Sequence, residues 1–297
     1  MSITSGDNLL IFGCGFSGEA IARLAAGNFA AITGTTRDAA KADRIRNAGA
    51  EPLVFDGEAL SPELVSRLAG TTHLLVSIAP GEAGDPVLNA LEKSEAALPA
   101  LKWTGYLSTV GVYGDHGGAW VDEQTEPRPA SKRSRQRLEA ETAWRTFAGA
   151  RGLPLAVLRL SGIYGPGRNA FVNIANGTAR RLVKPGQVFN RIHRDDIAAA
   201  ALAAARKKAG GIFNITDDEP APPQDVVTFA HQLAGVAPPP ETDFETADLS
   251  PMARSFYGEN KRVSNAKSKA ELGLAYAFPD YRTALTRMWR EESWKPQ

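Results

Sequence analysis

Apolar and polar positions near the start of the chain follow a pattern that predicts a strand, a turn and a helix in that order. Residues 9–12 form an apolar run, LLIF, which gives way to the glycine-rich segment GCGFSG. Apolar residues then return at helical spacing, at Ala20, Ile21, Leu24 and Ala25. Together these elements predict a βα unit within the first 27 residues.

The alternation of apolar runs and helical patterns continues along the chain. The runs predict strands at residues 29–36, 51–56, 71–79 and 104–109. The patterns between them predict helices at residues 39–48, from Ser61-Pro62 onward, and at 86–97. The run at 71–79 is nearly all apolar, as expected for a strand buried on both faces of a parallel sheet. The alternation predicts right-handed crossovers and therefore an α/β fold with a doubly wound parallel sheet.

The glycine-rich segment has the spacing G-x-G-x-x-G, with Gly13, Gly15 and Gly18 at its fixed positions and Phe16 and Ser17 between them. The first glycine permits a tight turn, the second lets the backbone approach a pyrophosphate, and the third lets helix and strand pack closely. Free N–H groups and the positive end of the helix dipole would hold the phosphates. We therefore expect a dinucleotide to bind here, with a plain structural turn as the alternative.

The end of the second predicted strand bears on the choice of dinucleotide. Thr36 lies eighteen residues beyond Gly18 and is followed by Arg37 and Asp38. A hydroxyl and a guanidinium suit a 2′-phosphate, which favours NADP, although Arg37 would equally suit a solvated surface. NAD remains the alternative, because Asp38 would suit a ribose 2′-hydroxyl, or it could simply cap the next helix.

The end of the strand at 71–79 falls where a bound cofactor would lie, beyond the carboxyl end of the sheet. Ser77 and Ala79 are therefore further candidates for cofactor binding.

Composition narrows the class of partner. Among 297 residues, 43% are hydrophobic and the net charge is +1, which gives no reason to expect nucleic acid or an anionic membrane surface. No run approaches the ~18 apolar residues that span a bilayer, and no basic-then-apolar leader opens the chain. The four histidines lack the spacing of a metal site. We expect a protein that acts on a small molecule, without nucleic acid, membrane or metal.

The single cysteine, Cys14, cannot form an internal disulfide, which fits a reducing compartment and predicts a cytoplasmic protein. Its place before a helix raises the alternative of a reactive thiol. A small residue that fits the turn is the interpretation we favour.

Several motifs follow one another in a fixed order over the rest of the chain. They are YLSTVGVYG at 106–114, DEQTEP at 122–127, a helical pattern at 131–149, LAVLR at 155–159, SGIYGPG at 161–167, IHRDDI at 192–197, GIFNIT at 211–216 and NKRVSN at 260–265. This set resembles the extended short-chain dehydrogenase/reductases, the NAD-dependent epimerase/dehydratase family, over nearly the whole chain. The resemblance implies a Rossmann-type doubly wound parallel sheet with a smaller C-terminal substrate lobe.

The resemblance also implies how the chain divides. The expected parts are an NAD(P)-binding Rossmann domain at 1–165, with its sheet completed by about 187–216, and a substrate-binding lobe at 166–186 and 217–297. Proline and glycine clusters in the second half suit such an irregular lobe.

The family's usual active site is missing. Its carbonyl chemistry uses a Tyr as general acid/base, a Lys four residues later, and a Ser or Thr on the fifth strand. The Ser/Thr position corresponds to Thr109, but the Tyr and Lys positions fall on Arg133 and Arg137. No tyrosine occurs between Tyr113 and Tyr164, so the Tyr-x-x-x-Lys helix is absent. A phenol with a pKa of ~10 needs an adjacent cation to work near neutrality, so the resemblance does not carry the family's proton transfer over to this chain.

Other side chains are candidates for the missing roles. With Arg135, the two arginines make a basic cluster at even spacing on one helix. This cluster forms either an anion clamp, beside the nicotinamide or on an anionic substrate, or a solvated face paired with Glu139 and Glu141. A tyrosine at the end of the fifth strand is a substitute acid. The Tyr-x-x-x-Lys match at residues 257–261 lies past the last predicted strand, and we treat it as a chance match. The candidate catalytic residues are Thr109, Tyr113, Arg133 and Arg137.

Two functions fit these observations. The first is an NADP(H)-dependent oxidoreductase or epimerase-type enzyme that acts on a small anionic or nucleotide-linked substrate. The second is a non-catalytic NADP(H)-binding sensor or interaction protein. Apolar positions around 87–98 and 138–147 would permit the homodimer that the family often forms, and they would equally serve as core.

Overall fold

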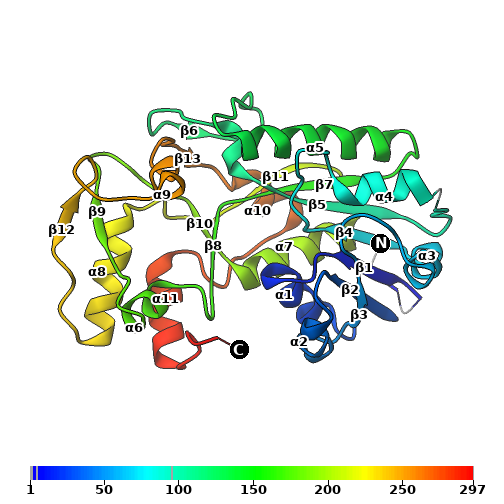
Figure 1. The fold of residues 1–297 in the computed structure, drawn as a ribbon, viewed down its shortest axis with the longest axis horizontal. Helices are drawn as coiled ribbons and strands as arrows, with labels where there is room; N and C mark the ends of the chain where they lie inside the picture. The colour runs from blue at the N-terminus through cyan, green and yellow to red at the C-terminus, as the bar shows by residue number, and fades with distance from the viewer. Residues whose placement is uncertain (1–2, 5, 95, 297) are drawn as a thin grey trace.

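The computed structural model describes residues 3–4, 6–94 and 96–296 and has a seven-stranded parallel sheet at its centre (Figure 1). The strands lie in the order β11-β7-β5-β4-β1-β2-β3. Their bounds are β1 (Asn8–Phe12), β2 (Ala31–Thr36), β3 (Glu51–Val54), β4 (His73–Val76), β5 (Trp103–Thr109), β7 (Leu155–Leu160) and β11 (Gly211–Ile215). The order runs outward from β1 in both directions, which confirms the predicted Rossmann-type doubly wound fold.

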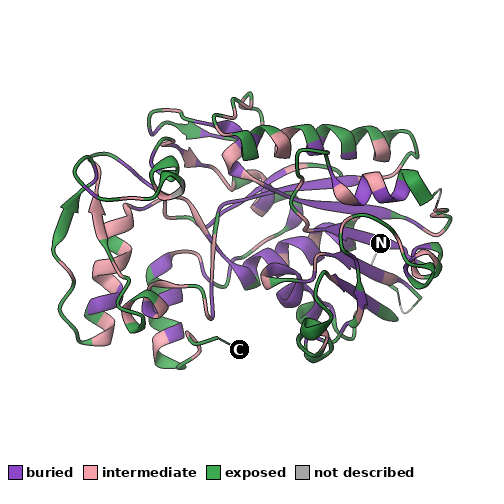
Figure 2. Ribbon diagram, viewed as in Figure 1, coloured by how far each residue is buried: buried purple, intermediate pink, exposed green. Residues whose placement is uncertain are grey.

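Helices cover both faces of this sheet (Figure 1). One layer holds α1 (Phe16–Ala25), α2 (Ala42–Asn47), α7 (Arg194–Lys207) and α10 (Ala266–Leu272), and the other holds α3 (Pro62–Ala69), α4 (Pro86–Ser94) and α5 (Lys132–Gly149). Strand side chains alternate between the layers. In β1, Leu9 and Ile11 pack in the first core, and Leu10 and Phe12 pack in the second. Figure 2 shows the resulting band of buried residues along the sheet.

Local signals explain several helix boundaries. Ser61 caps α3, with its hydroxyl accepting a hydrogen bond from the Leu64 N–H, and Ser131 caps α5 through Ser134 N–H. The helix expected at 86–97 ends at Ser94, and residue 95 lies outside the described residues. The apolar positions of α4 and α5 pack within the chain's own core, and a homodimer stays a prediction.

The second half of the chain adds a smaller lobe beside the sheet (Figure 1). It contains β8 (Gly162–Tyr164) paired with β10 (Arg191–His193), β9 (Arg181–Val183) paired with β12 (Glu241–Asp243), and the helices α6 (Ala170–Ala175), α8 (Pro223–Ala234), α9 (Pro251–Phe256) and α11 (Tyr281–Arg290). A core of its own forms around Phe171, Tyr281 and Met288.

Part of the segment assigned to the lobe returns to the sheet. Leu272 and Tyr276 pack in the first Rossmann core, and β13 (Arg262–Val263) pairs with β6 (Trp120–Val121). The division of the chain into two parts stays a prediction.

Candidate functional site

Gly13 shapes the turn that follows β1. Its φ is +87°, and a Cβ there would lie 2.8 Å from the Ile78 side chain. Its N–H donates to the Thr35 hydroxyl at 2.9 Å, and the Cys14 N–H donates to the Thr35 carbonyl at 2.7 Å. The turn is therefore built against β2 and the end of β4, and Gly13 is required by the protein itself.

Gly15 and Gly18 differ in what surrounds them. A Cβ on Gly18 would lie 2.8 Å from the Gly13 carbonyl oxygen, so close packing of α1 excludes a side chain there. Gly15 is exposed, and a Cβ on it would meet no protein atom within 4 Å. No protein atom excludes a side chain at 15, so the space beside this backbone is open to a ligand that approaches it closely.

The start of α1 is open to an anion. No side chain caps this ten-residue helix at Gly15, and it begins with Phe16, which is half-buried, and Ser17, which is buried. N–H groups of an uncapped helix start, together with the helix dipole, suit a pyrophosphate. The residues predicted to hold a dinucleotide therefore suit its pyrophosphate.

Cys14 is a packing residue. It is buried, and burial raises the pKa of its thiol to about 12, so the thiol stays protonated near neutral pH. A Cβ on Gly34 would lie 2.8 Å from the Cys14 Cβ, which shows how closely β2 packs against it. The structure thus favours the small-residue interpretation over a reactive thiol.

The residues at the end of β2 have different partners. Asp38 caps the 3-10 turn η1 (Ala39–Lys41), with its carboxylate accepting from the Ala40 N–H at 2.9 Å. The Thr36 hydroxyl accepts from the Asp38 N–H at 3.2 Å. Arg37 is exposed, and within the described part of the chain its side chain has no ion pair. The helix-capping interpretation of Asp38 is therefore confirmed.

Ser77 and Ala79 lie at the same edge of the sheet as the glycine turn. β4 ends at Val76, and the Ser77 N–H donates to the Phe12 carbonyl oxygen at 2.8 Å. Between them, Ile78 contacts the Gly13 position. The structure thus brings the predicted cofactor residues together from the ends of three neighbouring strands.

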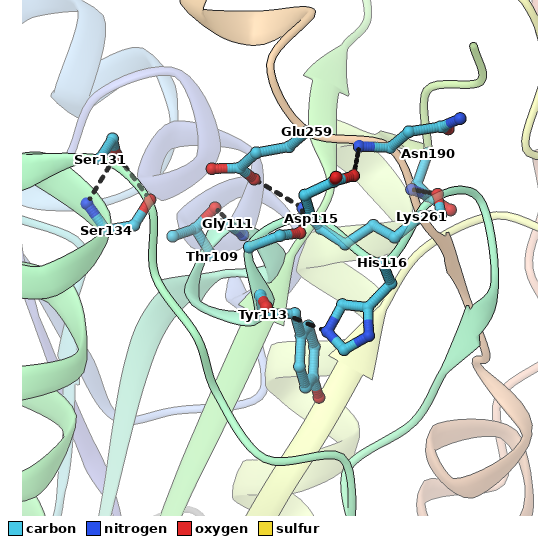
Figure 3. A network of polar contacts seen from close by, with 12 residues as sticks. Thr109, Gly111, Tyr113, Asp115, His116, Ser131, Ser134, Asn190, Glu259 and Lys261 are labelled. Atoms are coloured by element: carbon cyan, nitrogen blue, oxygen red, sulfur yellow. Dashed lines mark hydrogen bonds and ion pairs between the residues drawn. The ribbon is translucent and has the colours of Figure 1, made fainter.

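Thr109 ends β5 and begins the 3-10 turn η2 (Val110–Tyr113), where its hydroxyl accepts from the Gly111 N–H at 3.1 Å. A Cβ on Gly111 would lie 3.3 Å from the Thr109 hydroxyl and 3.0 Å from the Ser134 hydroxyl. The two hydroxyls therefore approach the same point, as Figure 3 shows. Ser134 was missed in the sequence, because only the packing of α5 against η2 brings it there.

Arg137 lies at the ends of β4 and β5. Its Nη1 donates to the Leu107 carbonyl oxygen at 2.9 Å and to the Tyr106 hydroxyl at 3.1 Å. Arg133 is exposed, with its guanidinium carbon 5.6 Å from the centroid of the Phe256 ring. Neither arginine pairs with Glu141, so that part of the solvated-face interpretation is wrong.

Glu141 instead belongs to a buried network. It accepts two hydrogen bonds from Arg159, at 2.7 and 3.1 Å, and the two side chains are 1% and 2% exposed. The Ser108 hydroxyl also donates to Glu141. The Arg159 guanidinium lies 4.8 Å from the centroid of the Tyr113 ring, so the network joins β5, α5 and β7.

Tyr113 points into the protein, towards the last residues of β7 and β11. It is fully buried, and its hydroxyl donates to the Asn214 side chain at 2.8 Å. Burial raises the pKa of its phenol. Its hydroxyl is therefore engaged with a buried partner, and this speaks against the prediction that Tyr113 replaces the missing acid.

The Tyr-x-x-x-Lys match at residues 257–261 is not a catalytic pair. Tyr257 stacks on Phe244 with ring centroids 4.7 Å apart. The buried Lys261 donates to the Gly114 carbonyl oxygen at 2.8 Å and pairs with Glu259 at 2.6 Å (Figure 3). The two side chains thus have separate partners.

The described residues contain no group of three or more side chains placed to hold a metal ion. Nor does the described part of the chain have a helix whose length and apolar character would let it cross a membrane.

A sequence model described as the NAD dependent epimerase/dehydratase family matches residues 9–216, which run from β1 to just beyond β11. The chain belongs to this family. The resemblance to this family that the sequence motifs indicated is therefore confirmed.

Solved structures extend the comparison to the whole chain. A functionally unknown conserved protein from Silicibacter pomeroyi is 47% identical, with a TM-score of 0.86 over 96% of this chain and 99% of that one. Human epimerase family protein SDR39U1, solved with NADPH, is 18% identical, with a TM-score of 0.72 over 95% and 99% of the two chains. At that identity the likeness concerns the fold alone.

A curated relative has a named activity. The 3-diazoavenalumate denitrifying reductase of a Streptomyces species is 28% identical over 243 residues, which are 77% of this chain and 73% of that protein.

Proposed function

We propose that this protein is an NADP(H)-dependent oxidoreductase or epimerase-type enzyme acting on a small anionic or nucleotide-linked substrate. The observation that carries the proposal is Gly15, which no protein contact requires to be glycine and which lies at an uncapped helix start. A pyrophosphate explains both features. Membership of the NAD dependent epimerase/dehydratase family supports the nicotinamide dinucleotide.

The end of β2 supports NADP over NAD. Arg37 is exposed and has no carboxylate partner among the described residues, so it is available for a 2′-phosphate. Asp38 already accepts a hydrogen bond as the cap of η1. A carboxylate engaged in this way is less available to a ribose hydroxyl.

When bound, the cofactor supplies or accepts the hydride. Thr109 would hold the reacting oxygen of the substrate, because its hydroxyl accepts from the Gly111 N–H and so keeps its own proton to donate. A guanidinium is a hydrogen-bond donor only, so the role of Arg137 is to stabilise negative charge at the ends of β4 and β5. Arg133, exposed nearby on α5, would attract the anionic substrate.

Reduction fits this set of groups better than epimerisation. The described residues near Thr109 include no Tyr–Lys pair that could take a proton from a substrate hydroxyl and later return it, as epimerisation requires, since Tyr113 and Tyr106 are both buried. Reduction needs only the delivery of one proton to the oxygen that accepts the hydride's electron pair, and solvent water would supply it through the Thr109 hydroxyl. The named activity of the Streptomyces relative, a reductase, supports the same reaction class.

A fluorescence titration of the purified protein with NADPH and NADH in parallel tests the proposal. Tight binding with NADPH preferred, and loss of that preference in Arg37→Ala, is the expected result. Binding of neither nucleotide would refute it, and the glycine turn would then be a scaffold only.

The buried tyrosines also favour a second candidate, a protein that binds NADP(H) without turning it over. Stoichiometric binding of NADPH, with no hydride transfer to a panel of small anionic and nucleotide-linked carbonyl compounds, would support the sensor. NADPH oxidation that depends on one of those compounds would support the enzyme.

A further inference from the structure

Two arginines from distant parts of the chain reach the glycine turn. The guanidinium carbon of Arg194 lies 5.1 Å from the centroid of the Phe16 ring, and that of Arg168 lies 5.9 Å from it. Phe16 is the first residue of α1, directly after Gly15. Arg168 comes from the loop between β8 and α6, and Arg194 begins α7. Neither belongs to the motif that predicts dinucleotide binding.

The loop that carries Arg168 is held firmly. The backbones of Gly165 and Arg168 exchange two hydrogen bonds, at 3.0 and 2.9 Å. The Asn169 side chain donates to the carbonyl oxygens of Gly165 and Trp294, both at 2.8 Å, and the Gly167 N–H donates to Trp294 as well. The C-terminal segment therefore positions this loop beside the glycine turn.

Positive charge gathers at this corner of the molecule. The Arg168 side chain is exposed and makes no ion pair with any described residue. Arg194 is buried, and its Nε lies 3.5 Å from Asp195. Burial lowers the pKa of Arg194, and the nearby charge of Arg23 lowers it further. The carboxylate of Glu19 also faces Arg194, and it forms an ion pair with Arg44 at 3.0 Å.

We propose that Arg168, supported by Arg194, binds the pyrophosphate of the dinucleotide, so that the cofactor is held by the lobe as well as by the glycine turn. The inference rests on the proposed function. The flat face of the Phe16 ring orients the guanidinium groups, and a planar guanidinium can bind a phosphate with two parallel hydrogen bonds. An exposed arginine on a rigid loop loses little freedom when it does so.

Nucleotide titrations test Arg168 separately from the glycine turn. In Arg168→Gln the dissociation constants of NADPH and NADH should both rise about tenfold, as expected for the loss of a charge-assisted hydrogen bond at a partly exposed site. In Arg168→Lys both dissociation constants should lie between those of wild type and those of Arg168→Gln. Arg145→Gln removes the same charge from an exposed position on α5 and should leave both constants unchanged.

Displacement of NADPH by nucleotide fragments identifies the group that Arg168 binds. ADP-ribose keeps the pyrophosphate and should lose affinity in Arg168→Gln as NADPH does. Adenosine 2′-monophosphate has no pyrophosphate and should displace NADPH equally from both proteins after correction for the change in NADPH affinity.

The outcomes separate this inference from the proposed function. If wild type binds NADPH but Arg168→Gln binds both nucleotides within twofold of wild type, the role of Arg168 is refuted and the oxidoreductase proposal stands. A loss confined to NADPH would place Arg168 at the 2′-phosphate and would also refute the assignment. If wild type binds neither nucleotide, the proposed function itself fails.

Discussion

Replacing Gly15 and Gly18 with alanine, one at a time, tests the proposed cofactor site. Glycine at 18 is explained by close packing within the protein, whereas glycine at 15 is explained by close approach of a ligand. A methyl group on Gly18 would lie 2.8 Å from a backbone oxygen, whereas one on Gly15 would meet no protein atom within 4 Å. The φ of Gly15 is −98°, outside the left-handed region that favours glycine, and its ψ is −148°. Steric contact with the protein therefore excludes a side chain at 18 and not at 15.

The expected magnitudes follow from this difference. Gly15→Ala should keep the free energy of unfolding within about 1 kcal/mol of wild type, because a compatible Gly→Ala change acts mainly on the unfolded chain. The affinity of Gly15→Ala for NADPH should fall roughly ten- to a hundredfold, because the methyl group separates the backbone from the pyrophosphate. The magnitude follows from the loss of one hydrogen bond to a charged group, which contributes about 1.5–3 kcal/mol. Gly18→Ala should destabilise the protein by about 1–3 kcal/mol through the backbone clash.

Urea unfolding followed by tryptophan fluorescence measures stability, and NADPH titration measures affinity. Equal destabilisation by the two substitutions would show that Gly15 has a structural role after all. Wild-type affinity for NADPH in Gly15→Ala would show that the pyrophosphate lies elsewhere. Either result refutes the reasoning from the open space at Gly15.

Three other substitutions test the reacting end of the site and its support. Thr109→Val should abolish turnover and leave the dissociation constant of NADPH within twofold, and turnover that survives would exclude Thr109 as the group that holds the substrate. Glu141→Leu should lower the unfolding free energy in urea by about 3–5 kcal/mol, because it leaves the charge of Arg159 buried and unpaired. The exposed neighbour Glu139→Gln should change it by less than about 0.5 kcal/mol, and equal effects would contradict the argument. His193 caps α7, and burial lowers its pKa to about 4, below the ~6.5 of an unfolded histidine. Its contribution to stability is therefore complete above pH 6.5 and is lost as the pH falls towards 4. His193→Asn should lose less stability over that interval, and an unchanged slope would contradict the assignment.

The grouping of the candidate cofactor residues was predictable because its signals are local or follow from sheet topology. The spacing of Gly13, Gly15 and Gly18 reflects steric needs within one βα unit, and the structure shows those needs directly at Gly13 and Gly18. Residues at the ends of neighbouring parallel strands share one edge of a sheet, so strand order alone is enough to place Ser77 beside the glycine turn.

The reacting end was less predictable, because the direction of a side chain at a strand end depends on its distant partners. Tyr113 follows β5 as expected, but its hydroxyl is bound by Asn214, which lies 101 residues away in the chain. Glu141 had nearby arginines on its own helix and pairs instead with Arg159 on β7. In both cases, burial in a shared core decided the partner.

By itself, the sequence determined the doubly wound fold, the glycine turn and the absence of the Tyr-x-x-x-Lys helix, since these depend on periodicity and short spacing. Only the tertiary structure decided that Tyr113 is buried, that Ser134 lies beside Thr109, and that Arg168 reaches Phe16. Those contacts join segments far apart in the chain. Their geometry is set by how the lobe and the helices pack on the sheet, which no local pattern records.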